Sequence, residues 1–168
     1  MKKLLLFTGF ICFFSCNDGD LQIETVDFDS ITTVQSCNAI SASAANVLFK
    51  INGDEALILE LPSGSLANEV TTTDIVREVD EQVVITYRIF SDNVTNAYFC
   101  DAIPSIEPTV IEEIIAENGQ VFITTVAGEG DTFLHTIQLS EISFVNENGD
   151  TRITDQRINE FGTVTTSL

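Results

Sequence analysis

The sequence predicts an all-β domain, built as a two-sheet antiparallel sandwich of the immunoglobulin-like or jelly-roll-like kind. Three Asn-Gly pairs, at residues 52–53, 118–119 and 148–149, lie beside runs of β-branched and apolar residues. Asn-Gly favours the positive φ angles of a two-residue hairpin turn. Strand-like runs succeed one another roughly every 8–15 residues, with turn residues between them, and this spacing is typical of sandwiches.

The first hairpin is predicted from alternating apolar and polar residues on both sides of the turn at 52–53. Side chains two positions apart share one face of a strand, so Val47, Phe49 and Ile51 form one face of the first strand, and Leu57, Leu59 and Leu61 form one face of its neighbour. The next predicted strand has its buried face at Val83, Ile85, Tyr87 and Ile89. Ala97–Asp101 is then predicted as a short strand that carries Cys100.

The second half of the chain contains longer predicted strands. Residues 109–117 fit either a helix that begins near Pro108 or, because of their β-branched content, a strand; we expect the strand. Residues 133–144 predict a long strand whose apolar phase switches near Ser140 and Glu141, which indicates a bulge or a crossing between sheets. Two edge strands, at residues 152–158 and 161–164, are expected to close the domain.

The first fifteen residues have the pattern of a secretory signal. Lys2 and Lys3 precede an uncharged, mostly apolar run that is too short to span a bilayer of roughly 30 Å. The four residues Phe13-Phe14-Ser15-Cys16, at the end of this stretch, resemble the lipobox of bacterial lipoproteins, in which the cysteine is acylated and becomes the first mature residue. The resemblance implies a signal peptide at 1–15, a lipidated cysteine with an acidic tether at 16–20, and a β domain at 21–168. A buried hydrophobic element, or an ordinary signal cut elsewhere, is the alternative.

The charge of the chain restricts its partners. It has 26 acidic and 7 basic residues, for a formal net charge of −19. This charge repels phosphate backbones, so we expect no nucleic acid partner. It also repels anionic lipid, so membrane attachment is expected through acyl chains on Cys16, because two or more such chains anchor stably.

Two cysteines remain once the signal and the lipid acceptor are set aside. Cys37 and Cys100 would face a compartment that oxidises thiols, and we expect them to form a disulfide. In the chain-entropy model such a bond stabilises the fold by about 4 kcal/mol. The alternative is a pair of separate buried thiols.

No motif for a known catalytic mechanism occurs in the sequence, and we expect no catalytic residue. The only histidine, His135, alternates in phase with Phe133, Ile137 and Leu139, which predicts a core position rather than a general base. A Ser-His-Asp or Cys-His mechanism would have to run through this residue, since the base must reach the nucleophile.

Calcium is the cofactor that the sequence favours most, although we expect none. Carboxylates on turns supply the oxygen ligands that calcium takes, and the candidates are Asp54, Glu129, Asp131 and Asp150. The alternative explains all of them as turn formers, since Asn, Asp and Gly are the commonest turn residues.

The lipobox, the Asn17–Asp20 tether and the acidic β-rich body together resemble the uncharacterised small lipoproteins of Flavobacteria and other Bacteroidetes. Acidic residues directly after the acylated cysteine also resemble the export signal that brings Bacteroidetes lipoproteins to the outer face of the outer membrane. The resemblance implies a lipid anchor in the outer membrane and exposure at the cell surface. A periplasm-facing location is the alternative.

We therefore expect a lipid-anchored, non-enzymatic binding or structural module with a protein or glycan partner. The loops expected to present its contacts are Ser63–Asn68, Ser91–Asn96 and Gly128–Asp131. The alternative is a secreted, carboxylate-dependent enzyme, for example one that acts on glycans, with or without calcium. Clustered acids around a concave pocket would favour the enzyme, and a flat, filled surface would favour the binding module.

Overall fold

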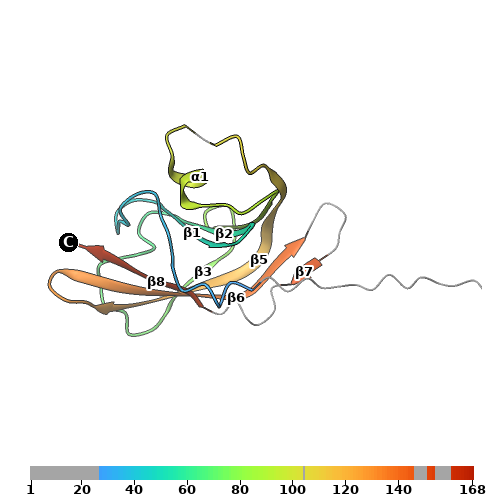
Figure 1. The fold of residues 1–168 in the computed structure, drawn as a ribbon. Coiled ribbons are helices and arrows are strands. Elements are labelled where there is room, and N and C mark those ends of the chain that lie inside the picture. The colour runs from blue at the N-terminus through green and yellow to red at the C-terminus, as the bar shows by residue number, and fades with distance from the viewer. Residues whose placement is uncertain (1–26, 104, 146–150, 154–159) are drawn as a thin grey trace, which may run out of the picture.

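The computed structural model describes residues 27–103, 105–145, 151–153 and 160–168. Their strands form one curled antiparallel sheet (Figure 1). The elements are β1 (Asn46–Asn52), β2 (Glu55–Leu61), β3 (Ile75–Glu78), β4 (Val84–Phe90), α1 (Asn96–Cys100), β5 (Val110–Ala127), β6 (Thr132–Val145), β7 (Thr151–Ile153) and β8 (Glu160–Ser167). The predicted all-β class is confirmed.

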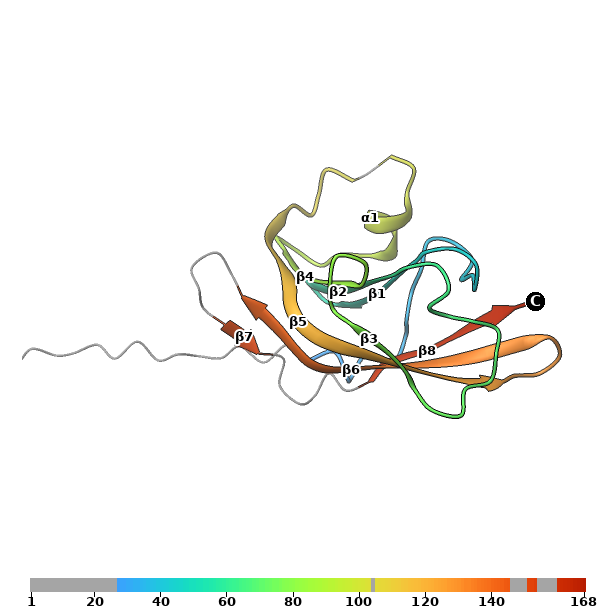
Figure 2. The same ribbon diagram turned by 180° about the vertical axis from the view of Figure 1, so that it is seen from behind.

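The strand order is β1-β2-β4-β5-β6-β7, with β3 also paired to β5 and β8 also paired to β6. The first part of β5 pairs with β4, and its second part pairs with β3 and β6. Seen from behind, β5 turns from the upper strands to the lower ones, with β3 beside its lower part (Figure 2). Since strand pairing joins all eight strands into one sheet, the expected sandwich of two separate sheets is not confirmed.

The bend in β5 is located at Asn118-Gly119. The prediction of a hairpin turn there is wrong, because both residues lie inside β5 and the register with β6 shifts on either side of Asn118. Gly119 has a φ of +143°, and a Cβ atom on it would lie 2.3 Å from Ile142 Cδ1. Opposite, Glu141 has a φ of +54°, which confirms the predicted phase switch in β6. Bulges of this kind bend a strand and increase its twist.

The other predicted turns and strands have mixed outcomes. Asn52-Gly53 is a hairpin turn, with Gly53 at a φ of +65° between β1 and β2. The strand expected at residues 109–117 is confirmed as the first part of β5. The pair at residues 148–149 lies outside the described residues. The two closing strands correspond to β7 and β8, although residues 154–159 are also outside the described part.

The strand predicted at Ala97–Asp101 is wrong, because these residues form the helix α1 and its C-cap. The helix lies above the outer face of β1, β2 and β4 (Figure 1). Phe99 stacks on Phe49 with ring centroids 4.5 Å apart, and Tyr98 packs edge-on against Phe90 at 4.9 Å. The two aromatic side chains are adjacent in sequence and both face the sheet, which one helical turn permits and a strand does not.

The core lies inside the curl and is filled mainly by aliphatic side chains from β2, β4, β5, β6 and β8. The face predicted to be buried on β1 is the outer one: Phe49 is covered by α1, whereas Val47 is 48% exposed. The inner face instead carries Leu48 and Lys50, which are 0% and 2% exposed. The predicted face is therefore buried at Phe49 but not at Val47, and the burial of a lysine on the opposite face was not predicted.

Candidate functional site

The curled sheet has an opening between β1 and β8, which we call the seam. Within the described residues, β1 pairs with one strand, β2, and β8 pairs with one strand, β6. Residues 27–40, which we call the strap, lie across this opening (Figure 1). The strap is linked to the edge of β1 by two backbone hydrogen bonds of 2.9 Å between Gln35 and Phe49.

Apolar side chains fix the strap over the core. Phe28 is fully buried, and the partly buried strap residues that pack against the core are Ile31, Val34 and Ile40. Gly162 of β8 passes under the strap so closely that a Cβ atom on it would lie 2.4 Å from Val34 Cγ2. The strap is therefore an integral part of the fold.

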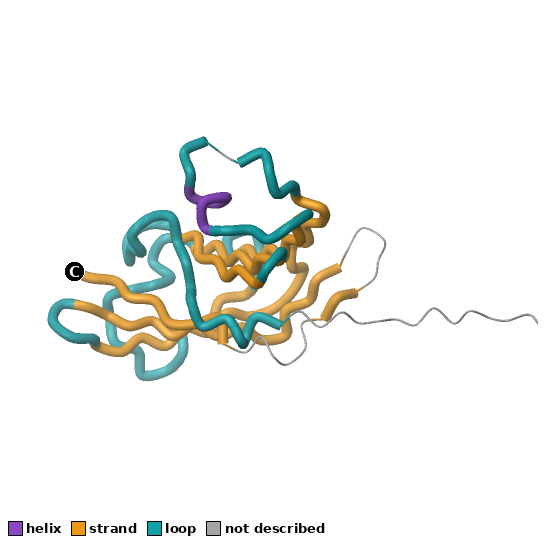
Figure 3. The backbone as a smooth tube through the Cα atoms, in the orientation of Figure 1, coloured by secondary structure: helices purple, strands orange, loops and turns teal. Residues whose placement is uncertain are grey.

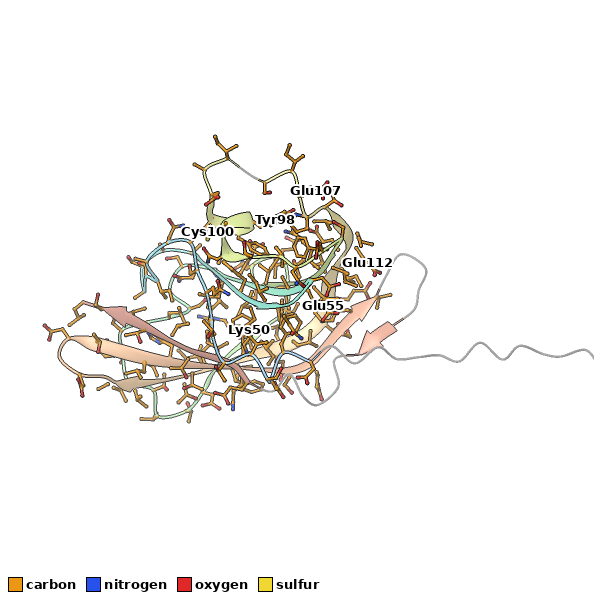
Figure 4. All side chains as sticks on the ribbon, viewed as in Figure 1. Lys50, Glu55, Tyr98, Cys100, Glu107 and Glu112 are labelled. Atoms are coloured by element: carbon orange, nitrogen blue, oxygen red, sulfur yellow. A yellow bond between two sulfur atoms is a disulfide. The ribbon has the colours of Figure 1, made fainter. Side chains whose placement is uncertain are left out.

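Lys50 is the buried charge of the seam. Figure 4 shows it inside the curl of the sheet, below β1. Its Nζ donates hydrogen bonds to the carbonyl oxygens of Phe28, at 2.9 Å, and Glu160, at 3.0 Å, and lies 5.7 Å from the ring centroid of Phe161. It thereby joins the strap, β1 and β8.

The electrostatics of Lys50 reflect two opposed effects. Burial is the larger one and lowers the pKa of the ammonium group, because the charged form loses solvation. The carboxylates of Asp29, Glu160 and Asp27 oppose this shift by stabilising the positive charge. Lys50 is thus a desolvated cation surrounded by acidic side chains at the point where three segments meet.

A small pocket of about 220 Å³ lies over Lys50. It is lined by Asp29, Ile31, Thr32, Lys50, Glu160, Gly162 and Thr163. The two carboxylates of this lining come from the strap and from β8, so that the fold brings together acids that are far apart in the sequence.

A larger, open pocket of about 430 Å³ lies further along the same edge of β8. Strap and strand line it together, through Ser36, Asn38, Ala39, Ile40, Thr165, Thr166 and Ser167. This lining has no charged side chain and combines hydroxyl and amide side chains with the apolar Ala39 and Ile40. The two pockets form one interrupted groove between the strap and β8, which we call the seam groove.

The edge of β8 presents backbone groups to this groove. The N–H of Leu168 donates a hydrogen bond to the carbonyl oxygen of Asp131, directly before β6. In an antiparallel pair, alternate residues of a strand direct their backbone groups to opposite sides. The N–H and C=O of Thr163, Thr165 and Ser167 therefore point away from β6. The Ser167 oxygen accepts a hydrogen bond from Asn68 Nδ2 at 3.1 Å. Within the described residues, no hydrogen bond from another segment reaches the outward backbone groups of Thr163 and Thr165.

His135 is a fully buried core residue, as its apolar phase predicted. Its Nδ1 lies 2.8 Å from Thr125 Oγ1, and its Nε2 lies 2.7 Å from Thr166 Oγ1. Thr166 donates its hydroxyl proton to Asn68 Oδ1, so it accepts from His135, which assigns the proton to Nε2. Thr125 then donates to Nδ1.

This network explains the chemistry open to His135. Burial lowers the pKa of the imidazole, so the ring is neutral around pH 7. Both ring nitrogens are occupied by threonine hydroxyls, and neither faces a substrate. The side chain is therefore a satisfied polar group in the core, with Thr166 connecting it to the larger pocket of the seam groove.

The cysteine pair expected from the sequence is confirmed. Cys37 and Cys100 form a disulfide across a sequence separation of 63. It connects the strap to α1, so one covalent bond joins the cover of the seam to the cover of the outer face (Figure 4). The predicted lipid acceptor, Cys16, lies outside the described residues.

The structure does not bring the calcium candidates together. Asp54 lies in the β1–β2 turn, where its carbonyl oxygen accepts from Phe90, near the start of β5. Glu129 and Asp131 lie in the β5–β6 hairpin, at the other end of β5. Asp150 is outside the described residues. Among the described residues, no three His, Cys, Asp or Glu side chains approach closely enough to bind one metal ion.

The three loops expected to present contacts differ in exposure. Ser63–Asn68 and Ser91–Asn96 are each anchored by a buried side chain, Leu66 in the first and Val94 in the second. Gly128–Asp131 is exposed at the tip of the β5–β6 hairpin. Of these loops, only the first reaches the seam groove, through the bond from Asn68 to Ser167.

The sequence contains one signal for the seam. Lys50 is the only lysine after Lys3, and it occupies the centre of an apolar run. A lone lysine in such a run indicates either a solvent-facing position or a buried cation with dedicated acceptors. Which of the two applies depends on the strap, whose place over the seam is not encoded in local periodicity.

The part of the chain that the structure describes includes no helix long and apolar enough to cross a membrane. Comparison with protein-family models, with curated proteins and with solved structures found no significant match to this chain.

Proposed function

We propose that this chain is a lipid-anchored, non-enzymatic module of the outer membrane surface that binds an extended polypeptide segment in the seam groove. The anchor in this proposal is Cys16, and it rests on the signal-like residues 1–16 and the acidic residues after them. The binding function rests on the edge of β8. The two parts are tested separately.

The observation that carries the binding function is the outward backbone of Thr163 and Thr165 beside an open pocket. An extended peptide can join such an edge as a further strand, because its main chain offers the complementary donors and acceptors. The strap forms the opposite wall and supplies hydroxyl and amide groups at Ser36 and Asn38. These groups can contact the side chains of a bound segment.

The seam carries few groups that could act as catalysts. His135 is buried with both nitrogens bonded, and Lys50 donates to two carbonyl oxygens. A general base must reach a proton of the substrate, and neither group is directed at the open pocket. These arrangements support a binding role.

The binding proposal is tested with Thr165→Pro. Proline removes the outward N–H and is compatible with an edge strand whose N–H faces solvent, so the variant should fold and lose the added strand. The matched control, Thr165→Ala, keeps the backbone donor. Peptides selected on the wild type from a phage-displayed random library should bind the alanine variant and bind the proline variant at least about tenfold more weakly. Equal binding to both variants would refute the site.

The anchor is tested by metabolic palmitate labelling and protease shaving of intact cells that express the wild type or Cys16→Ala. Label in the wild type alone, with removal by shaving, supports a surface lipoprotein. Label with resistance to shaving would place the anchor on the periplasmic side. Equal label in both proteins, or none, would contradict lipidation at this residue.

A second candidate function has one observation in its favour. Asp29 and Glu160 line the same small pocket, and two carboxylates on either side of a glycosidic bond are what glycoside hydrolysis requires. A carboxylate-dependent enzyme acting on glycans would lose turnover in Asp29→Asn and in Glu160→Gln. Absence of hydrolysis by the wild type across a panel of aryl glycosides and polysaccharides would remove this candidate.

A further inference from the structure

A second surface, distinct from the seam groove, carries four isoleucine side chains in solvent. Ile103, Ile106, Ile111 and Ile115 are 85%, 90%, 67% and 55% exposed, and we call them the isoleucine surface. The first two lie on the loop between α1 and β5, and the other two lie in the first part of β5. This loop arches over the upper side of the molecule, whereas β8 lies on the lower side (Figure 1).

The outer face of the sheet shows why Ile115 is exposed to solvent. The strand register places Phe49, Ile58, Thr86 and Ile115 in one row across β1, β2, β4 and β5. Exposure along this row is 1%, 6%, 7% and then 55%. The cover formed by α1 and its flanking residues therefore stops before β5, while the row continues with an apolar side chain.

The loop that carries Ile103 and Ile106 is fixed at both ends. At its start, Cys100 is bonded to Cys37 of the strap. At its end, Thr109 and Ser91 exchange two hydrogen bonds, of 2.8 Å between backbone groups and 3.0 Å to the Ser91 hydroxyl. In this anchored loop, the two isoleucine side chains are exposed to water and do not stabilise the isolated fold by burial. Exposed apolar side chains that lie together are typical of an interaction site.

The charges around the isoleucine surface define its partner. Residues 101–115 contain four acidic residues and no Lys or Arg, namely Asp101, Glu107, Glu112 and Glu113. Arg88 neutralises Glu113 through an ion pair, and the exposed Asp101 and Glu107 leave the border acidic. Figure 4 shows Glu107 and Glu112 at the loop and at the start of β5.

We infer that the isoleucine surface docks a protein partner whose apolar contact is bordered by lysine or arginine. A second copy of this chain would bring an identical acidic border into contact, and its net charge of −19 adds repulsion. An anionic bilayer is disfavoured for the same reason. A partner with lysine or arginine around its apolar contact is attracted by the acidic residues of this surface, and the complementary charges fix the orientation of the complex.

The test uses the full chain and two designed amphipathic helical peptides with the same leucine face. One peptide has a lysine border and the other has a glutamate border. The wild type should bind the lysine peptide at least about tenfold more tightly, and raised salt should weaken this binding. Ile103→Ser/Ile106→Ser should lose about tenfold in affinity for the lysine peptide.

Two exposed valines elsewhere supply matched controls. Val70 and Val126 are 52% and 50% exposed, and Val70→Ser/Val126→Ser should bind the lysine peptide as the wild type does. Equal affinity for both peptides, or equal loss in both double variants, would overturn the inference. It would also be overturned if the isoleucine variant abolished self-association in sedimentation, or binding to phosphatidylglycerol vesicles. These results would assign the surface to a second copy or to lipid.

Discussion

The two covers of the curled sheet use their apolar residues in opposite ways. The strap directs Phe28, Ile31 and Val34 into the core and leaves an open groove between itself and β8. The outer cover, residues 91–109, packs Tyr98 and Phe99 against the sheet but leaves its isoleucines in water. Apart from α1, the described residues of both covers are drawn as loops in Figure 3. The strap therefore contributes its apolar side chains to the core, whereas the outer cover buries only part of the outer face of the sheet and leaves its own isoleucines exposed.

The disulfide is the covalent link between the two covers, and its removal has the largest expected effect. In Cys37→Ser/Cys100→Ser the closed loop is released in the unfolded state, so the free energy of unfolding should fall by about 4 kcal/mol. Urea titration measures this change. Hydrogen exchange should show lost protection at Gln35 and Phe49, whose backbone bonds fix the strap to β1.

The double variant also compares the covers directly. If the strap is secured by its own core contacts, protection should fall more at α1, which has no fully buried residue, than at Phe28. Equal loss across both covers would contradict the distinction. A change in stability below about 1 kcal/mol would show that the covers are fixed independently of the bond.

Lys50→Met should have the second-largest effect. Methionine keeps the length of the side chain but leaves the carbonyl oxygens of Phe28 and Glu160 without their donor, at a cost of about 2–3 kcal/mol. It also removes the cation between the carboxylates of the strap and β8. Thermal and urea unfolding measure the loss. Arg77→Met, at an exposed position of β3, is the matched control and should change stability by less than about 0.5 kcal/mol.

A stabilised Lys50→Met variant would break the comparison between the covers. It would mean that desolvation of the ammonium outweighs its hydrogen bonds, as occurs for some buried ion pairs. The strap would then remain in place through its apolar residues alone.

The two Asn-Gly pairs within the described residues explain how far the sequence could predict the fold. Residues 52–53 and 118–119 have the same local signal, yet the first forms a hairpin and the second a bulge inside β5. The difference arises from Ile142, which packs against Gly119 from a strand that follows later in the chain. Local propensity predicts positive φ at both glycines, but only long-range pairing decides between turn and bulge.

The candidate site was predictable only in part, for the same reason. The Cys37–Cys100 pairing followed from composition and compartment, because no other cysteines competed for it. The seam groove did not, since it forms where the strap meets an edge strand more than a hundred residues later in the chain. The burial of Lys50 was not predicted, because alternation cannot reveal that α1 covers the outer side of β1.

His135 provides a test of the core beneath the strap with a smaller effect. Its folded pKa lies below the ordinary value of 6.5, so the unfolded chain takes up a proton first as the pH falls. Its contribution to stability is therefore complete above about pH 6.5 and is lost below it, by at most about 1.4 kcal/mol per pH unit. The chain has one histidine, so the stability difference between wild type and His135→Gln isolates this residue. A difference that stays constant from about pH 7 to about pH 5 would contradict its buried, neutral state.

The smallest expected effect on stability belongs to the isoleucines of the outer cover. Ile103→Ser/Ile106→Ser should change the free energy of unfolding by less than about 0.5 kcal/mol, because both side chains are already in water. Ile31→Ser in the strap removes a side chain that packs against the core, and it should cost about 1 kcal/mol or more. The contrast is the decisive point, since both covers contain isoleucine but only the strap uses it for folding. If Ile103→Ser/Ile106→Ser were less stable than Ile31→Ser, the two isoleucines of the outer cover would be buried in the folded protein. Their role in docking would then have to be abandoned.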